Sequence, residues 1–482
     1  MKKKCVAMML IAIMTASLAG CGSSKDGSGK SVKLDSDHPV SLTIWHYYNG
    51  AQQAMFDTLV KEFNASVGKE EGIYVESYSQ GSVSDLEEAV NSSLNGEVGA
   101  EELPDIFSSY SDTAYAVQQQ DKLADLSVYF TEDELSRYVD SYIQEGYFNQ
   151  DGALYLFPVA KSTEITMINK TDWEPFAEAT GTTVEELATT EGITEVAQRY
   201  YEWTDEQTPD DGKAFYGRDS MSNYFIIGMK QMGKEIFQVK DGKMTLNTDE
   251  DLIRRLWDNY YVPYMKGYFA SLGKFRSDDV KTGDILAYTG STSSAVYFPD
   301  TVEIGNKSYP IDYIVCDSPV MEGGENIKVQ QGAGMAVTKS DEEHEYAASV
   351  FLKWFTQKNQ NLRFVCESSY MPVLKEANSV DALDSVIKEN NIEVNQKVYD
   401  CFTTEMEDFD KTSFYTIGAF DNSYSARKIL DYSLADKAKA DKDAMDAAIA
   451  DGESREEALA QYLTDENFQS WYTEFCHSLE CI

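Results

Sequence analysis

The chain has 482 residues, 82 of them acidic and 41 basic, and a formal net charge of −41 at pH 7. A negative field of this size repels nucleic acids and anionic lipid headgroups, so it excludes both as binding partners. The length exceeds what one hydrophobic core normally serves, and it predicts two lobes.

The first residues have the pattern of a secretion signal. Three lysines precede an apolar run over residues 6–18, which is too short to span a membrane. Residues 18–21, Leu-Ala-Gly-Cys, resemble the lipobox of bacterial lipoproteins. We therefore expect removal of residues 1–20, a diacylglyceryl anchor on Cys21 and a flexible tether over 21–38. The alternative is an ordinary cleaved signal followed by an incidental cysteine.

From residue 40 to residue 110, strand and helix patterns alternate. Strands are predicted at 40–48, 72–78 and 103–110, and helices at 51–63 and 82–96, the second opening at Ser84. This order predicts parallel strands with right-handed crossovers, which is a doubly wound α/β sheet. Ligands bind such sheets beyond the carboxyl ends of the strands.

Strand and helix patterns also mark the later part of the chain. Residues 172–280 are predicted to be mainly helical, and 283–294 and 330–338 to form strands. Residues 343–356 form an amphipathic helix pattern, and the chain is mostly helical from Tyr424 onward.

The common catalytic and metal-binding motifs are missing from the sequence. The segment at His344 resembles HExxH but has alanine at position 348 in place of the second histidine. There is no P-loop, no GxSxG elbow, and no CxxC or zinc pattern among the cysteines, although Cys476 and Cys481 could pair. We therefore expect no metal and no cofactor. Carboxylates are too numerous for their spacing to test for a glycosidase pair.

Six segments, taken in order, resemble the family 1 extracellular solute-binding proteins, the family of the maltose-binding protein. They are "SLTIWHYY", "LPDIFSSYSDTAYAVQQQDKLADLS", "DGALYLFPVAKSTEITMINKTDWE", "GDILAYTGSTSS", "GGENIKVQQGAGMAVTKSDEEHEYAASVFLKWFT" and "SSYMPVLKEA". Two departures stand out: Ile168 replaces the usual aromatic residue of the third segment, and the fourth segment lacks its frequent tryptophan.

The resemblance implies a two-lobed, periplasmic-binding-protein-like fold in which each lobe is a sheet flanked by helices, with a ligand cleft between the lobes. The expected first lobe spans 39–160 and 292–334, and the second spans 163–288 and 338–482. The expected crossings between lobes lie near Val159–Thr163, Tyr288–Thr292 and Gly334–Thr338.

Ligand-binding residues follow from the strand-end rule and from the resemblance together. The set combines aromatic rings, which can stack on the C–H face of a sugar, with hydrogen-bonding side chains. The candidates are Trp45, His46, Tyr47, Gln80, Ser109, Tyr110 and Asp112 in the first lobe, Lys161, Ser162, Ser291 and Gln331 at the crossings, and Tyr224, Tyr370 and Tyr424 in the second lobe.

The resemblance also implies the function. The chain is expected to be a monomeric lipoprotein on the extracytoplasmic face that captures a neutral mono- or oligosaccharide by hinge closure and delivers it to the permease of an ABC importer. The expected cleft loops contain no arginine, the usual partner of an anionic ligand. Two alternatives are a secreted glycoside hydrolase and a glycan-binding adhesion or sensor lipoprotein.

Overall fold

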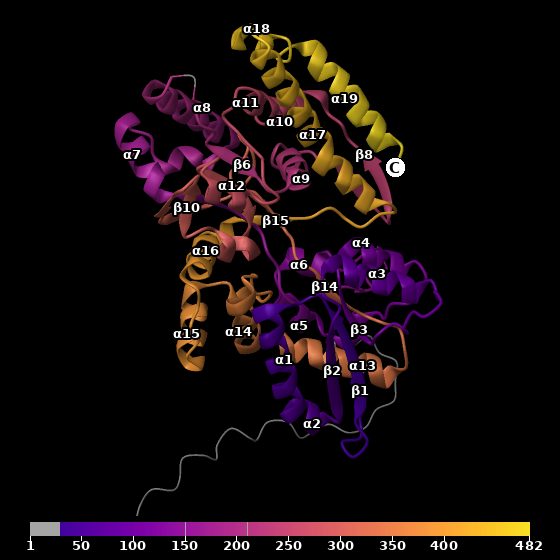
Figure 1. The fold of residues 1–482 in the computed structure, drawn as a ribbon. Helices are drawn as coiled ribbons and strands as arrows, with labels where there is room; N and C mark the ends of the chain where they lie inside the picture. Colours follow the sequence, from indigo (N-terminus) through magenta and orange to yellow (C-terminus); the bar gives the residue numbers. More distant parts are fainter. Residues whose placement is uncertain (1–28, 150, 210) are drawn as a thin grey trace, which may run out of the picture.

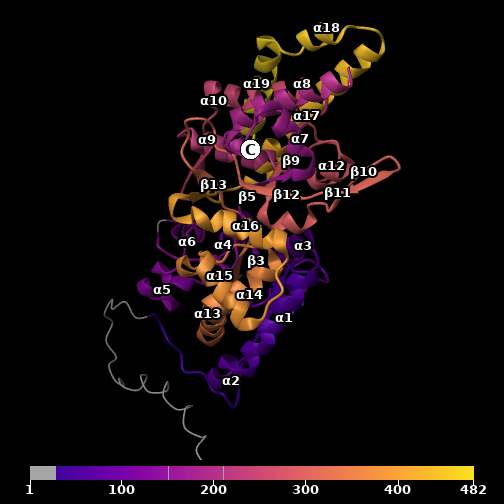
Figure 2. The same ribbon diagram turned by 90° about the vertical axis from the view of Figure 1, so that its left-hand side faces the viewer.

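The computed structural model describes residues 29–149, 151–209 and 211–482, which form two α/β lobes (Figures 1 and 2). The expected signal and Cys21 lie outside these ranges. Within them, no helix is both long and apolar enough to cross a membrane.

The first lobe is built on a five-stranded sheet in the order β2-β1-β3-β14-β4. Its strands are β1 (Val40–His46), β2 (Ile73–Ser79), β3 (Ile106–Ser109), β14 (Gly334–Val337) and β4 (Phe157–Pro158). β1 pairs in parallel with β2 and β3, whereas β14 runs antiparallel to β3 and β4. The parallel strands arise from the strand–helix alternation of residues 40–110, as predicted.

Helices flank this sheet in both views of the lower lobe (Figures 1 and 2). They are α1 (Gly50–Ala65), α2 (Val67–Glu71), α3 (Val83–Leu94), α4 (Ser111–Gln118), α5 (Glu132–Ser136), α6 (Asp140–Gln144), α13 (Glu342–Phe355), α14 (Lys358–Ser368) and α15 (Val380–Asn390). α1 buries Phe56, Leu59, Val60 and Phe63, which recur at helical spacing. α3 begins one residue before the predicted Ser84, because Ser82 caps it with a reciprocal bond to Asp85.

The second lobe contains a four-stranded sheet in the order β12-β5-β9-β6. Its strands are β12 (Tyr313–Asp317), β5 (Glu164–Asn169), β9 (Ala287–Ser291) and β6 (Tyr216–Arg218). β5 is antiparallel to both neighbours and β6 is parallel to β9. Two hairpins, β7 (Phe237–Lys240) with β8 (Lys243–Leu246) and β10 (Thr301–Ile304) with β11 (Lys307–Pro310), extend from this lobe.

Helices also flank the second sheet, so both lobes have the predicted α/β architecture. They are α7 (Lys170–Thr180), α8 (Thr190–Gln207), α9 (Met221–Gln231), α10 (Glu250–Asp258), α11 (Tyr261–Met265), α12 (Arg276–Thr282), α16 (Gln396–Glu407), α17 (Ser423–Ala450), α18 (Arg455–Ala460) and α19 (Asp465–Glu480). α17 packs against α9, α11 and α19, which confirms the helical reading of the chain after Tyr424.

The later boundaries between lobes differ from the expected ones. Residues 288–292, expected to cross, lie mostly in β9 at the middle of the second sheet, and β12 keeps residues 313–317 in the same lobe. Conversely, β14, expected to be a crossing, and the helices α13–α15, expected in the second lobe after residue 338, belong to the first. A short apolar strand carries no local signal for its sheet, because distant partners decide its pairing.

In the described part of the chain, three segments link the lobes. Residues 159–163 lead from β4 to β5, residues 330–333 lead from β13 (Ile327–Val329) to β14, and residues 391–395 lead from α15 to α16. The first two segments touch, because the backbones of Ser162 and Gln331 exchange two hydrogen bonds of 2.9 Å. β13 pairs in parallel with β15 (Ser413–Tyr415) beside them.

A buried ionic cluster ties α16 to these strands. The Lys328 ammonium on β13 lies 2.8 Å from a carboxylate oxygen of Glu405 on α16 and 2.7 Å from Asp317 on β12. Burial raises the pKa of Glu405 to about 7, against the opposing effect of Lys328. Its second oxygen has no hydrogen-bond partner among the described residues.

Glu405 predicts a pH dependence of stability. An unfolded glutamate ionises near pH ~4.3, so between that pH and about 7 the folded chain binds more protons than the unfolded chain. The contribution of Glu405 to stability therefore falls as the pH rises through this window. The prediction is tested by urea unfolding at several pH values. The free energy of unfolding of the wild type, minus that of Glu405→Gln, should decrease between about pH 4.5 and about pH 7.5. A difference that is flat or rises would contradict the assignment.

Candidate functional site

A cavity of about 380 Å³ lies between the lobes. The starts of α3 and α4 form its first-lobe wall, residues 416–419 and the start of α17 form its second-lobe wall, and Glu145 with residues 330–332 lies at the crossings. A volume of this size suits a small ligand, for which sites span roughly 300–1,000 Å³. Both lobes and the crossings therefore contribute to one site.

Tyr110, Glu87 and Asp112 line the first-lobe wall. Burial raises the pKa of the Glu87 carboxyl, and the negative charge of Asp112 raises it further. Burial also holds the pKa of Tyr110 well above its usual range, so the phenol stays neutral and can both donate and accept hydrogen bonds. This wall combines an aromatic ring with two carboxylates.

Other tyrosines support Tyr110 from within the first lobe. The hydroxyls of Tyr47 and Tyr370 are 3.3 Å apart and hydrogen-bonded. Burial raises the pKa of Tyr47, and the neighbouring Tyr370, Tyr110 and Tyr48 add to the effect. Tyr47 and Tyr370 are buried and do not line the cavity.

One face of α17 forms most of the second-lobe wall. Its members recur at i, i+3, i+4, i+7 and i+8, so they lie on a single stripe of the helix. They are Tyr424, Arg427, Lys428, Asp431 and Tyr432. Tyr424 and Tyr432 are 53% and 57% exposed, and the Lys428 ammonium lies 4.4 Å from the centroid of the Tyr424 ring.

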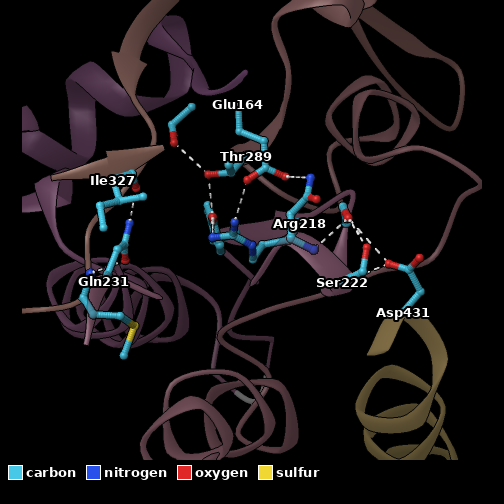
Figure 3. A network of polar contacts seen from close by, with 12 residues as sticks. Glu164, Arg218, Ser222, Gln231, Thr289, Ile327 and Asp431 are labelled. Atoms are coloured by element: carbon cyan, nitrogen blue, oxygen red, sulfur yellow. Dashed lines mark hydrogen bonds and ion pairs between the residues drawn. The ribbon is translucent and has the colours of Figure 1, made fainter. Parts of the chain in front are cut away.

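A buried polar network holds this face in place (Figure 3). Asp431 accepts a 2.7 Å hydrogen bond from the Ser222 backbone at the start of α9. Arg427 donates to the amide oxygen of Asn223 at 3.3 Å, and the Asn223 nitrogen donates to Glu164 at 2.9 Å. Glu164 is in turn paired with Arg218 at 3.0 Å, and both side chains are less than a tenth exposed. Asp431 is thus anchored to α9, and Arg427 is anchored through Asn223 to the charged pair of the second sheet.

The structure brings part of the predicted site together. Four of the predicted residues line the cavity: Tyr110, Asp112, Gln331 and Tyr424. The others do not: Trp45, His46, Tyr47, Gln80, Ser109, Lys161, Ser162, Tyr224, Ser291 and Tyr370.

Packing explains why the others lie away from it. β1 is buried on both faces, so Trp45 and His46 are inside the first lobe, where burial lowers the pKa of His46 to about 4. The Tyr224 hydroxyl donates to the backbone oxygen of Leu256, 2.8 Å away inside the second lobe. Ser291 caps a turn of 3-10 helix, and Gln80 bonds through its backbone to His46.

Sequence reasoning missed Glu87, Glu145, Gln330 and most of the α17 face. The α17 residues carried a usable signal, because a helical stripe that holds aromatic and charged residues in place of aliphatic ones does not serve a core. Glu145 carried none, since it stands just after the short helix α6 and reaches the cavity only through tertiary packing.

The Glu164–Arg218 pair generates a stability prediction. Arg218→Met leaves a buried carboxylate without its cation, which should cost about 3–5 kcal/mol in urea unfolding. The double variant Glu164→Gln/Arg218→Met removes both charges and should recover much of that loss. Equal losses in the single and double variants would show that the charges do not interact.

One protein family shares a sequence pattern with most of this chain. The model of the bacterial extracellular solute-binding protein family matches residues 58–392. No curated protein sequence matches the chain.

Solved structures share the fold at low sequence identity. The cyclic α-maltosyl-1,6-maltose binding protein of Arthrobacter globiformis is 19% identical with a TM-score of 0.63, and the match covers 90% of this chain and 100% of that one. UgpB of Mycobacterium tuberculosis, solved with glycerophosphocholine, is 16% identical with a TM-score of 0.63, covering 92% and 98%. The GacH receptor of Streptomyces glaucescens, solved with acarbose, is 15% identical with a TM-score of 0.59, covering 91% and 98%.

The family model covers well over half of the chain, and the matched structures are binding proteins with this two-lobed fold. This finding separates the leading sequence interpretation from the hydrolase alternative. The chain belongs to the bacterial extracellular solute-binding proteins, a family of receptors and not of enzymes.

Proposed function

We propose that this protein captures a neutral carbohydrate in the interlobe cavity and delivers it to an ABC importer. The observation that carries the proposal is the cavity itself, whose walls come from both lobes and whose lining mixes tyrosines with hydrogen-bonding side chains. Capture would close the lobes by a hinge motion at the crossing segments. The importer would then recognise the closed form.

The lining suits a polyhydroxylated ligand. The carboxylates of Glu87, Asp112 and Asp431 accept hydrogen bonds, and Arg427 donates them, while a sugar hydroxyl can do both. The cleft is not free of arginine, contrary to the sequence expectation, but these carboxylates offset Arg427 and Lys428. The cavity therefore offers no excess of positive charge to an anion.

The exposed tyrosines of α17 provide stacking surfaces. Eight residues of helix separate Tyr424 from Tyr432, which corresponds to ~12 Å along the axis. This distance exceeds the length of one pyranose ring, so the two rings fit an oligosaccharide better than a monosaccharide. Among the matched structures, one is named a cyclic α-maltosyl-1,6-maltose binding protein, one was solved with acarbose, and one, MalE of Bdellovibrio bacteriovorus, is bound to maltotriose. These names support the same ligand class.

A thermal-shift panel tests the ligand class. Maltotriose, mannotriose, glucose and glycerophosphocholine should be compared, and a ligand at ~100 times its Kd stabilises the folded chain by ~2.7 kcal/mol. We expect a neutral trisaccharide to raise the Tm by a few degrees. Tyr432→Ala should weaken its binding several-fold, whereas Tyr78→Ala, an exposed tyrosine on β2 outside the cavity, should not. Stabilisation by glycerophosphocholine alone would overturn the carbohydrate proposal.

We also propose that Cys21 anchors the protein to the outer face of the cell membrane, where it acts as a monomer. The lipobox-like segment at residues 18–21 and the polar stretch after it support this. An extracellular family fits the location, because a receptor held near the membrane meets its permease at high local concentration.

Cell fractionation tests the anchor. Cys21→Ala should move the protein from the membrane fraction to the soluble fraction, because it removes the proposed attachment point of the lipid. Cys481→Ala is the matched control, since that cysteine is exposed near the end of α19 and should leave the distribution unchanged. Retention of Cys21→Ala in the membrane fraction would contradict the proposal.

A further inference from the structure

A compact polar cluster lies where the first two crossings meet the cavity. It consists of Glu145, Lys161, Gln330 and Gly332, and all except Lys161 line the cavity. The Lys161 side chain is only 1% exposed, so it is not available to a ligand as predicted from the sequence. The cluster is called here the hinge clamp.

Lys161 connects three parts of the hinge clamp. Its ammonium lies 2.5 Å from Oε2 of Glu145 and donates a 2.8 Å hydrogen bond to the backbone oxygen of Gly332. Lys161 stands in the first crossing and Gly332 in the second, while Glu145 follows α6 in the first lobe. One buried cation therefore binds both crossings and a cavity-lining carboxylate.

The two crossings are packed too closely here to move independently. Gly332 has a φ of +94°, and a Cβ at this position would lie 3.0 Å from the Ala160 backbone oxygen and 3.2 Å from the Cα of Lys161. The reciprocal backbone bonds between Ser162 and Gln331 lie directly beside this contact. A substitution of Lys161 should therefore affect the conformation of both segments.

Glu145 keeps one oxygen for a ligand. Its Oε2 accepts from Lys161 and, at 2.6 Å, from the side-chain nitrogen of Gln330. Its Oε1 has no hydrogen bond among the described residues. Because a carboxylate only accepts, the Gln330 nitrogen must face it, and this leaves the amide oxygen of Gln330 buried without a partner. The free oxygen of Glu145 is thus an acceptor that lacks a donor, whereas the amide oxygen of Gln330 is fully buried. The side-chain nitrogen of the adjacent Gln331 is a buried donor without a partner among the described residues.

We propose that the free oxygen of Glu145 binds a hydrogen-bond donor of the ligand. In this proposal Lys161 is a positioning residue, because it holds Glu145 against the two crossing segments. The inference rests on the proposed capture of a ligand in this cavity. A hydroxyl supplies the missing donor, whereas a carboxylate or a phosphodiester has none at neutral pH. The hinge end of the cavity therefore selects the hydroxyl-bearing part of a ligand.

The binding test uses maltotriose and mannotriose as probes in calorimetry. Glu145→Gln keeps the shape but weakens the acceptor and loses the charge, so the affinity should fall about ten- to a hundredfold. Lys161→Met should weaken binding comparably. Lys353→Met is the matched control, because Lys353 also joins a glutamate, Glu134, to a backbone oxygen in the first lobe but lies outside the cavity.

A double-variant cycle separates positioning from a general loss of structure. If Lys161 acts through Glu145, which it contacts, its removal should weaken binding only while Glu145 is present. The double variant Glu145→Gln/Lys161→Met should therefore bind about as well as Glu145→Gln alone. Losses of affinity that simply add would contradict the positioning role.

Hydrogen exchange of the free protein tests the hinge directly. Lys161→Met should speed amide exchange about tenfold in both 159–163 and 330–333, and Lys353→Met should not. Wild-type affinity in Glu145→Gln would overturn the ligand contact, and unchanged exchange in Lys161→Met would overturn the positioning role. If neither trisaccharide binds the wild type, the proposed function and the ligand contact fail together, and the exchange result alone decides the positioning role.

Discussion

The structure depends on the contact between the first two crossing segments. A site shared by two lobes keeps its geometry only if the chain segments between them hold a defined path. Here the backbones of Ser162 and Gln331 pair, and Gly332 allows the approach because it has no side chain. The adjacent cation of Lys161 satisfies the nearby backbone oxygen and neutralises the nearby carboxylate. Without these bonds, the buried polar groups at this place would be more stable in contact with water, and this would favour separation of the two crossing segments.

Both walls of the cavity are held by buried side chains. In the second lobe, Glu164 and Arg218 fix Asn223, which holds Arg427. In the first lobe, the wall depends on packed tyrosines behind Tyr110. A buried ion pair adds little net stability, but its directional bonds fix where side chains point. The second-lobe wall is therefore specified more by hydrogen bonds, and the first-lobe wall more by ring packing.

The sequence predicted the fold better than it predicted the site. Periodicity identified β1, α1, α3 and β3, because each has a local pattern of apolar residues. It could not assign β9 and β14 to a sheet, since that choice rests on contacts between residues far apart in the chain. The rule that ligands bind beyond strand ends correctly predicted that Tyr110 and Asp112 line the cavity. The same rule also selected His46, but β1 is buried on both faces and His46 is therefore not at the surface.

The length of α17 has a mechanical consequence. This helix has its first turns in the cavity wall and its last turn beside α18, at the far end of the second lobe (Figure 1). Its 28 residues span ~42 Å, and successive Lys–Asp pairs four residues apart, such as Lys437 with Asp441, stiffen its outer half. A rigid rod fixed near a pivot is a lever arm. A rotation of a few degrees between the lobes, too small to see at the ligand, becomes a displacement of several ångströms at the outer tip of α17.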